Sequence, residues 1–185
     1  MKTQADRQAK PVIVLDTSAF LAGFDPFSLA AEQVTVPKVE EEILRNSMVK
    51  MRFEAAVESG KLKVKAPTLE AADSAKEYAS RVGDAHKLSE TDMQLLGLAF
   101  ELKSLGYTPQ IVTDDYSIQN VATQMGIGFL ALATFGIKRL LEWIRYCPAC
   151  HRQYPANCKI EECQVCGTRL KRKPRRTTKN RNNLF

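Results

Sequence analysis

The sequence predicts an α/β fold in which helices flank a parallel sheet, followed by a small cysteine-rich module and a basic tail. Short apolar runs rich in β-branched residues alternate with segments of helical periodicity over residues 11–131. All five cysteines lie between Cys147 and Cys166. Residues 138–185 hold thirteen basic and three acidic side chains, whereas residues 1–137 hold fourteen basic and eighteen acidic ones.

Length and composition exclude several classes of protein. The chain has 185 residues, of which 44% are hydrophobic and 26% charged, as in globular domains with a real core. Wholesale disorder, collagen and a disulfide miniprotein are therefore excluded. No apolar run approaches the roughly 20 residues of a membrane span, and the polar start lacks the apolar core of a secretion signal. We therefore expect a cytoplasmic protein with no membrane partner.

The first half of the chain is expected to contain three strands. Val12–Leu15 is a continuous apolar run of the kind buried in a parallel sheet, and it ends at Asp16. A second strand at 34–36 leads through Pro37 into a helix-rich stretch, and a third strand is expected at 62–64.

The second half continues the alternation. Ser89 and Asp92 resemble a capping box that opens a helix ending near Leu105. The remaining expected elements are a helix over 69–82, a strand at 111–112, a helix over 116–125 and a strand over 127–130. Residues 135–143 are expected to be a helical or extended connector.

The cysteine spacing predicts one structural zinc ion. Cys147 and Cys150 form one pair, twelve residues separate it from the next, and Cys163 and Cys166 form the second. Two such pairs complete a tetrahedron around zinc, which would replace the core that so short a segment lacks. A disulfide pair is the alternative, but a cytosolic setting disfavours it. Cys158 lies outside both pairs.

Acidic residues follow the predicted strands. Asp16 comes directly after the first strand, and Asp114 and Asp115 come directly after the strand at 111–112. The carboxyl ends of parallel strands are where ligands bind in open sheets. Asp92, in the first turn of its helix, could point at the same edge.

A further acid lies in the helix after Pro37. The apolar stripe at Val39 and Ile43 leaves Glu40 and Glu42 equally placed beside it, so geometry alone does not choose between them.

Each of these acids could instead cap a helix or belong to a solvated face. Four carboxylates at one edge would repel one another unless a cation neutralised them, however, and hard oxygen ligands suit Mg²⁺ or Mn²⁺. An acidic body with a basic end is also typical of a protein whose tail contacts phosphates, although a merely solubilising tail is the alternative.

Four acidic motifs resemble those of PIN-domain nucleases. They are Val14-Leu15-Asp16-Thr17-Ser18, a glutamate within residues 39–43, Ser89-Glu90-Thr91-Asp92, and Val112-Thr113-Asp114-Asp115. The phrases at 89–96 and 113–121, followed by a four-cysteine ribbon, are similar to the Nob family in its short, archaeal form. Members of that family are endonucleases that mature the 3′ end of small-subunit ribosomal RNA.

The resemblance implies roles for individual residues. Catalytic metal binding falls on Asp16, Asp92, Glu42 and Asp115, with Asp114 as the less favoured choice for the fourth acid. The ion would be Mn²⁺ or Mg²⁺, and the products would carry 5′-phosphate and 3′-hydroxyl ends. The zinc ligands would be Cys147, Cys150, Cys163 and Cys166.

The resemblance also implies a substrate and a domain plan. The substrate would be precursor small-subunit rRNA in pre-ribosomal particles. Other ribosome-assembly proteins are possible further partners. The residues expected to bind flanking RNA are Arg169, Lys171, Arg172, Lys173, Arg175 and Arg176. The expected parts are a flexible start (1–10), a nuclease domain (11–131), a connector (132–144), a zinc ribbon (145–170) and a flexible basic tail (171–185).

Three other functions remain possible from the sequence. They are a non-catalytic RNA-binding assembly factor, a toxin-type PIN ribonuclease and a DNA-directed zinc-ribbon factor. The full set of acids argues against the first, the ribbon against the second and the acidic body against the third.

Overall fold

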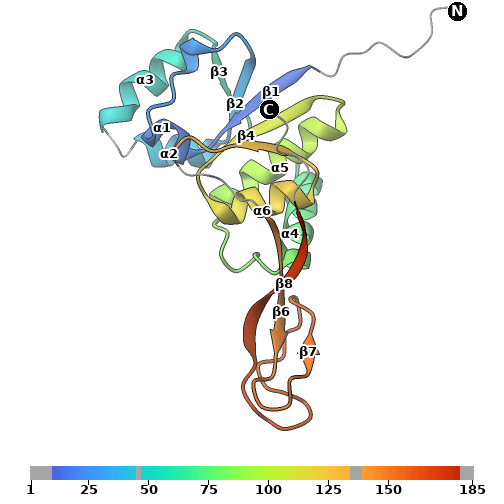
Figure 1. Cartoon of the computed structure of the whole chain (residues 1–185). Coiled ribbons are helices and arrows are strands. Elements are labelled where there is room, and N and C mark those ends of the chain that lie inside the picture. The colour runs from blue at the N-terminus through green and yellow to red at the C-terminus, as the bar shows by residue number, and fades with distance from the viewer. Residues whose placement is uncertain (1–9, 45–46, 134–138, 180–185) are drawn as a thin grey trace, which may run out of the picture.

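The computed structural model describes residues 10–44, 47–133 and 139–179. They form an α/β body and a narrow β stem that projects from it, with the cysteine-rich loops at the far end of the stem (Figure 1).

A five-stranded parallel sheet lies at the centre of the body. Its order is β3-β2-β1-β4-β5. The strands are β1 (Pro11–Leu15), β2 (Glu32–Thr35), β3 (Leu62–Val64), β4 (Thr108–Val112) and β5 (Gly128–Leu130). The two central strands end in register, because Leu15 of β1 pairs with Val112 of β4. Residues that follow these two strands are thereby placed side by side at the carboxyl edge.

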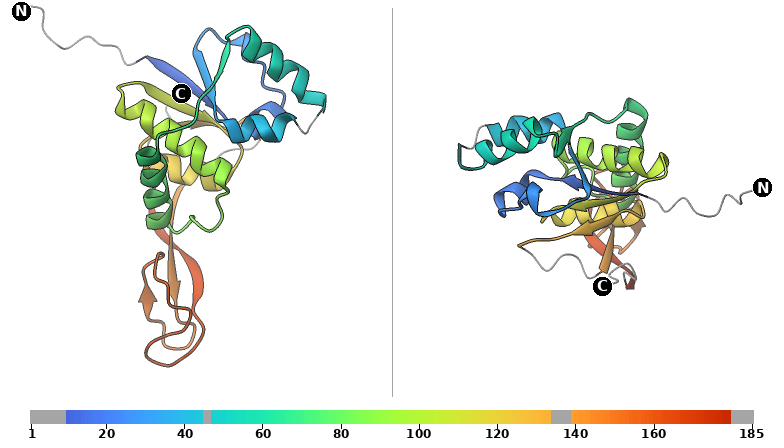
Figure 2. Two further views of the ribbon diagram at one scale, coloured as in Figure 1. Left: turned by 180° about the vertical axis from the view of Figure 1, so that it is seen from behind. Right: turned by 90° about the horizontal axis from the view of Figure 1, so that it is seen from above.

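Helices cover both faces of this sheet, with α6 on the face opposite α5 (Figure 2). They are α1 (Thr17–Leu21), the short 3₁₀ helix η1 (Pro26–Ser28), α2 (Pro37–Leu44), α3 (Ser47–Glu58), α4 (Leu69–Val82), α5 (Glu90–Ser104) and α6 (Tyr116–Gln124). The predicted α/β class is confirmed. Within the described ranges, no helix is long and apolar enough to cross a membrane.

Helix α5 is held by local signals that the sequence announces. Ser89 and Asp92 form the capping box, each side chain bonding the other's backbone amide. Farther along, Gly97 lets α4 approach closely, because a Cβ there would lie 3.1 Å from the Cα of Ala72. The buried face of α4 is correspondingly built from small residues, including Ala75 and Ala79.

The stem is an antiparallel sheet in the order β7-β6-β8. Its strands are β6 (Arg139–Tyr146), β7 (Gln153–Tyr154) and β8 (Lys171–Lys179). Tyr146 of β6 pairs with Lys171 of β8, so the two long strands flank the whole cysteine-rich segment.

This pairing differs from the predicted tail. Residues 171–179 form a strand, so the expectation of a flexible segment over 171–185 is wrong for them, and 180–185 lie outside the described residues. β8 is an edge strand, a place where basic side chains and Pro174 are tolerated, and its charge therefore concealed its strand character. Of the predicted connector, residues 139–144 belong to β6, the extended alternative, and 134–138 lie outside the described residues.

The stem meets the body at the C-terminal end of α4. Gly83 ends this helix in the left-handed conformation with φ +78°. A Cβ added at Gly83 would lie 2.7 Å from the Cβ of Ala156 and 3.0 Å from that of Trp143. The backbone of the body at Gly83 is therefore in direct contact with Trp143 of the stem and Ala156 of the ribbon.

We expect Gly83→Ala to destabilise the protein more than Gly60→Ala. Both glycines have positive φ, so both substitutions cost about 1 kcal/mol in backbone strain, but nothing lies within 4 Å of a Cβ at Gly60. Only the Gly83 variant should also displace the stem. Urea unfolding gives the two stabilities, and the fluorescence of Trp143, the single tryptophan, reports the junction. Equal losses with unchanged fluorescence would contradict the close contact.

Candidate active site and zinc centre

Asp16 lies at the carboxyl end of β1 and is only 6% exposed. It caps α1 by accepting a hydrogen bond of 2.7 Å from the backbone amide of Thr17. Its other oxygen accepts bonds from the hydroxyls of Ser18 (2.6 Å) and Thr113 (2.8 Å). The hydroxyl of Thr113 comes from the end of β4, so Asp16 joins the ends of the two central strands.

Glu42 of α2 bridges two other parts of this edge. One oxygen accepts a 2.6 Å hydrogen bond from the hydroxyl of Thr17, and the other accepts a 2.6 Å bond from that of Thr91. Those threonines are the chain neighbours of Asp16 and Asp92. The adjacent Glu41 instead pairs with Lys38 at 3.2 Å. The contacts favour Glu42 as the member of the acidic cluster.

Asp92 lies at the start of α5, where it closes the capping box with Ser89. Its partial burial raises the pKa of the carboxyl, and the negative charges of Asp16 and Asp115 raise it further. Burial likewise raises the pKa of Asp16, even though four hydrogen bonds, two from side chains and two from backbone amides, favour the ionised form. Ionising these carboxyls thus has a cost that a bound cation would offset.

The two acids after β4 face different partners. Asp115 caps α6, with the amides of Ser117 and Ile118 donating to one oxygen at 2.5 and 3.4 Å. Asp114 turns to the segment after β5, where the amides of Leu132 and Ala133 donate to it at 3.1 and 3.0 Å. The charge of Asp115 contributes to the raised pKa of Asp92, whereas the carboxylate of Asp114 accepts bonds from the segment after β5, and this favours Asp115 as the fourth acid.

The acids are not gathered tightly enough to enclose one ion unaided. Among the described residues, the four cysteines are the only group of three or more potential ligands whose atoms lie within 4.8 Å of one another. The donor set of carboxylates nevertheless suits Mg²⁺ or Mn²⁺, which keep several waters and bind through one or two carboxylates. The cluster fits such an ion at its edge.

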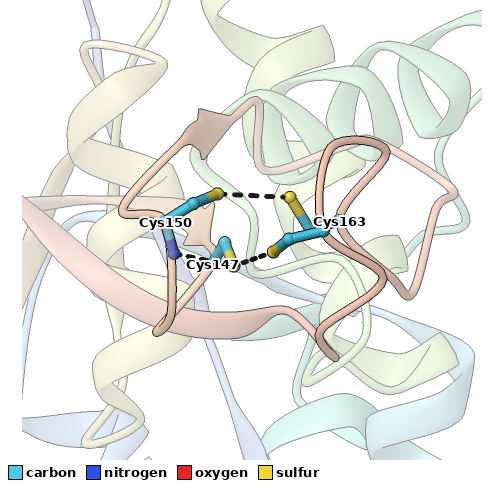
Figure 3. Close-up of side chains that lie close together, drawn as sticks. Cys147, Cys150 and Cys163 are labelled. Carbon is cyan, nitrogen blue, oxygen red and sulfur yellow. Dashed lines mark hydrogen bonds between the residues drawn. The ribbon is translucent and has the colours of Figure 1, made fainter.

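The predicted zinc ligands do converge. The side chains of Cys147, Cys150 and Cys163 point toward one another (Figure 3), and the Sγ atoms of Cys150 and Cys163 lie 3.5 Å apart. The Sγ atoms of Cys147 and Cys166 lie 3.3 Å apart. Four thiolates at about 2.3 Å from a zinc ion have sulfurs roughly 3.8 Å apart, so small shifts would accommodate it.

Local donors favour the thiolate at two of the four cysteines, Cys163 and Cys147, whereas the neighbouring sulfur of Cys163 contributes to raising the pKa of Cys150 to about 11. The hydroxyl of Tyr154 donates to Cys163 at 3.2 Å and lowers the pKa of that thiol to about 6. The backbone amide of Cys150 donates to the sulfur of Cys147 at 3.4 Å and lowers the pKa of that thiol as well. Thiolates are the form that binds zinc. Tyr154 is therefore in contact with the cysteine quartet, whereas Cys158 lies outside the quartet, as expected.

The six basic residues expected to contact RNA differ in their surroundings. Arg169, Lys171 and Arg175 are exposed, and the ammonium of Lys173 lies 4.5 Å from the ring centroid of Tyr146. The side chain of Arg176 lies outside the description. Arg172 differs, because its guanidinium bonds the carboxylate of Asp84 at 2.9 Å and the carbonyl of Gly83. It joins the stem to the body.

The comparisons with known proteins agree with this geometry. Residues 13–102 match the model of the PIN domain of ribonuclease. The protein named Endoribonuclease Nob1 of Methanothermobacter thermautotrophicus is 40% identical, with 88% of this chain aligned to 93% of that protein. Its namesake from Pyrococcus abyssi is 36% identical over 89% and 94% of the two chains. The chain belongs to the Nob1 endoribonuclease family.

A further relative is more distant than these two Nob1 proteins. It is named Ribonuclease VapC1, from Thermoplasma acidophilum, and is 34% identical, with 87% of this chain aligned to 77% of that protein. The higher Nob1 identities and the cysteine quartet do not favour the toxin-type alternative. The Nob1 matches extend well beyond the PIN segment, so both body and ribbon belong to the family pattern.

Sequence reasoning missed the hydroxyls of the Nob1 site. Thr17, Ser18, Thr91 and Thr113 each bond a carboxylate of the cluster, and they hold Asp16 and Glu42 in place. Their positions directly beside the acids in Asp16-Thr17-Ser18, Thr91-Asp92 and Thr113-Asp114-Asp115 were an available signal.

We expect Cys166→Ser to unfold the ribbon and leave the body folded, because the body has its own apolar core while the ribbon depends on metal. Zinc content should fall. The emission of Trp143 should shift, because Arg172, whose guanidinium lies over the Trp143 ring, comes shortly after the ribbon in the chain. Most of the far-ultraviolet helical signal should remain. Cys158→Ser is the matched control and should keep the zinc, and a loss of zinc there would contradict the assigned quartet.

Proposed function

We propose that this protein is a metal-dependent endoribonuclease that matures the 3′ end of small-subunit ribosomal RNA within pre-ribosomal particles in the cytoplasm. The observation that carries the proposal is the bridge made by Glu42 between Thr17 and Thr91. It draws the acids of three elements into one cluster, in a chain whose family members are named endoribonucleases.

Asp16, Glu42, Asp92 and Asp115 would hold the catalytic ion, and the threonine and serine hydroxyls would orient the first two. A bound Mn²⁺ or Mg²⁺ would supply a water of lowered pKa and charge stabilisation at the scissile phosphate. The leaving group would be the ribose 3′ oxygen, which gives 5′-phosphate and 3′-hydroxyl ends. Such a site contacts mainly phosphate, so the selection of RNA has to come from another surface.

That surface is the zinc ribbon with its stem. Arg169, Lys171, Lys173, Arg175 and Arg176 would contact phosphates of the flanking RNA. Arg172 does not belong to this set, because its guanidinium is engaged with Asp84 at the junction. The nuclease domain would thus cover residues 11–131, and the RNA-binding part would be the stem together with the ribbon.

Glu42→Gln should slow cleavage by about 100-fold or more, equivalent to about 3 kcal/mol of transition-state stabilisation. The reason is that an amide binds a cation more weakly and loses acceptor capacity for the two threonines. Glu41→Gln is the matched control, an exposed neighbour on the same helix. The measurement is single-turnover cleavage of a short RNA spanning the immature 3′ end, with Mn²⁺. Equal rates for both variants would overturn the proposed ligand set.

Metal binding can be tested apart from cleavage. Mn²⁺ should raise the melting temperature of the zinc-loaded protein, since a ligand that binds the folded state stabilises it. Asp16→Asn should abolish both this rise and the cleavage while keeping RNA affinity. Cleavage by Asp16→Asn at the native rate would overturn the proposed set of metal ligands. Wild-type protein that bound RNA but neither bound Mn²⁺ nor cleaved the RNA would be the non-catalytic assembly factor.

A further inference from the structure

A pocket of about 500 Å³ lies where the stem joins the body. Ser80, Gly83 and His86 line it from the body side, and Ile144, Asn157 and Leu170 are among its lining residues from the stem and ribbon. The volume lies within the range of roughly 300–1,000 Å³ that is usual for ligand sites. It takes no part in the acidic cluster or in the zinc centre.

The pocket is strongly cationic. Its charged lining residues are Arg145, Lys159, Glu161, Arg169, Lys171 and Arg172. Two of the five basic side chains are engaged, because Arg145 donates to the carbonyl of Ile160 at 2.8 Å and Arg172 binds Asp84. In the described part of the chain, Lys159, Arg169 and Lys171 belong to no ion pair. Three cations therefore remain available to an anion.

The same pocket offers an apolar surface. Ile144, Ala156 and Leu170 line it and are each half-buried. The ring of Trp143 is less available, since the guanidinium carbon of Arg172 lies 4.1 Å and the ammonium of Lys87 4.9 Å from its centroid. Apolar side chains beside free cations match a flat base attached to a phosphate.

The walls are fixed in position. The close approach at Gly83 and the bonds of Arg172 to Asp84 and to Nε2 of His86, at 2.9 Å each, hold the stem against the body. Burial and the neighbouring charge of Arg172 lower the pKa of His86, so its neutral ring accepts that bond. A preformed pocket avoids the entropic cost of ordering its walls around a ligand.

We propose that this pocket binds one unstacked nucleotide of the RNA strand, with the base against Ile144, Ala156 and Leu170 and the phosphates near Lys159, Arg169 and Lys171. The proposal rests on the proposed function and gives the RNA a defined register. RNA-binding proteins commonly read single strands by taking splayed bases into such pockets. One captured nucleotide would set which phosphate reaches the acidic cluster.

Abasic substitutions walked one at a time along a short RNA of the immature 3′ end test this. Binding is measured with the zinc-loaded chain and no added Mg²⁺ or Mn²⁺. One position should lose about 10-fold in affinity when its base is removed. Asn157→Trp, at an exposed position of the pocket, should abolish that dependence on position. Arg169→Gln should weaken the dependence of affinity on the position of the missing base. Arg175 is exposed and lies outside the pocket lining, so Arg175→Gln should lower the affinity equally for every RNA of the set.

Cys158 gives a second readout in the unaltered protein. It lines the pocket, whereas zinc protects the other four thiols. Intact RNA should slow its alkylation several-fold, and RNA lacking the critical base should protect it much less; Cys158→Ser gives the background. Uniform abasic effects together with unprotected Cys158 would overturn the pocket proposal even if cleavage persists. Absence of RNA binding and cleavage by the wild type would instead overturn the proposed function.

Discussion

The buried carboxylate of Asp84 fixes the stem to the body. Its residue is 2% exposed, and such a charge is stable in a protein only when its oxygens are paired. One oxygen binds Arg172 from β8, and the other accepts a 2.7 Å bond from the amide of Asn120 in α6. One side chain thereby holds a strand of the stem against a helix of the body. The position of the stem on the body therefore depends on this link.

The acidic cluster combines structural and chemical roles in the same residues. Asp16, Asp92 and Asp115 each help to start a helix, so the donors that a carboxylate needs are supplied by helix N-termini. The interpretation as simple caps was thus correct for all three, and it does not exclude metal binding. Burial raises the pKa of both Asp16 and Asp92 despite their capping bonds, and at Asp92 the charges of Asp16 and Asp115 raise it further.

Features with local signals could be predicted from the sequence. The buried run of β1, the capping box of α5 and the paired cysteines each depend on neighbours within a few residues. Helix α1 was missed because its five residues show no helical period and its start depends on Asp16. β8 was missed because only its pairing with β6 makes a strand of a basic run. The role of Arg172 could not be foreseen, since its partner Asp84 lies 88 residues earlier.

The stem changes how the two halves of the chain depend on each other. A flexible tail would let the ribbon hold RNA independently of the nuclease body. Instead the chain enters the ribbon through β6 and leaves it through β8. Arg172, the second residue of β8, binds Asp84 of the body. Zinc bound by the cysteine quartet would order the loops between the two strands, and the strands would transmit that order to the junction. In the proposed function, zinc at the far end of the stem would thereby support the position from which RNA held by the ribbon reaches the carboxylates of the body.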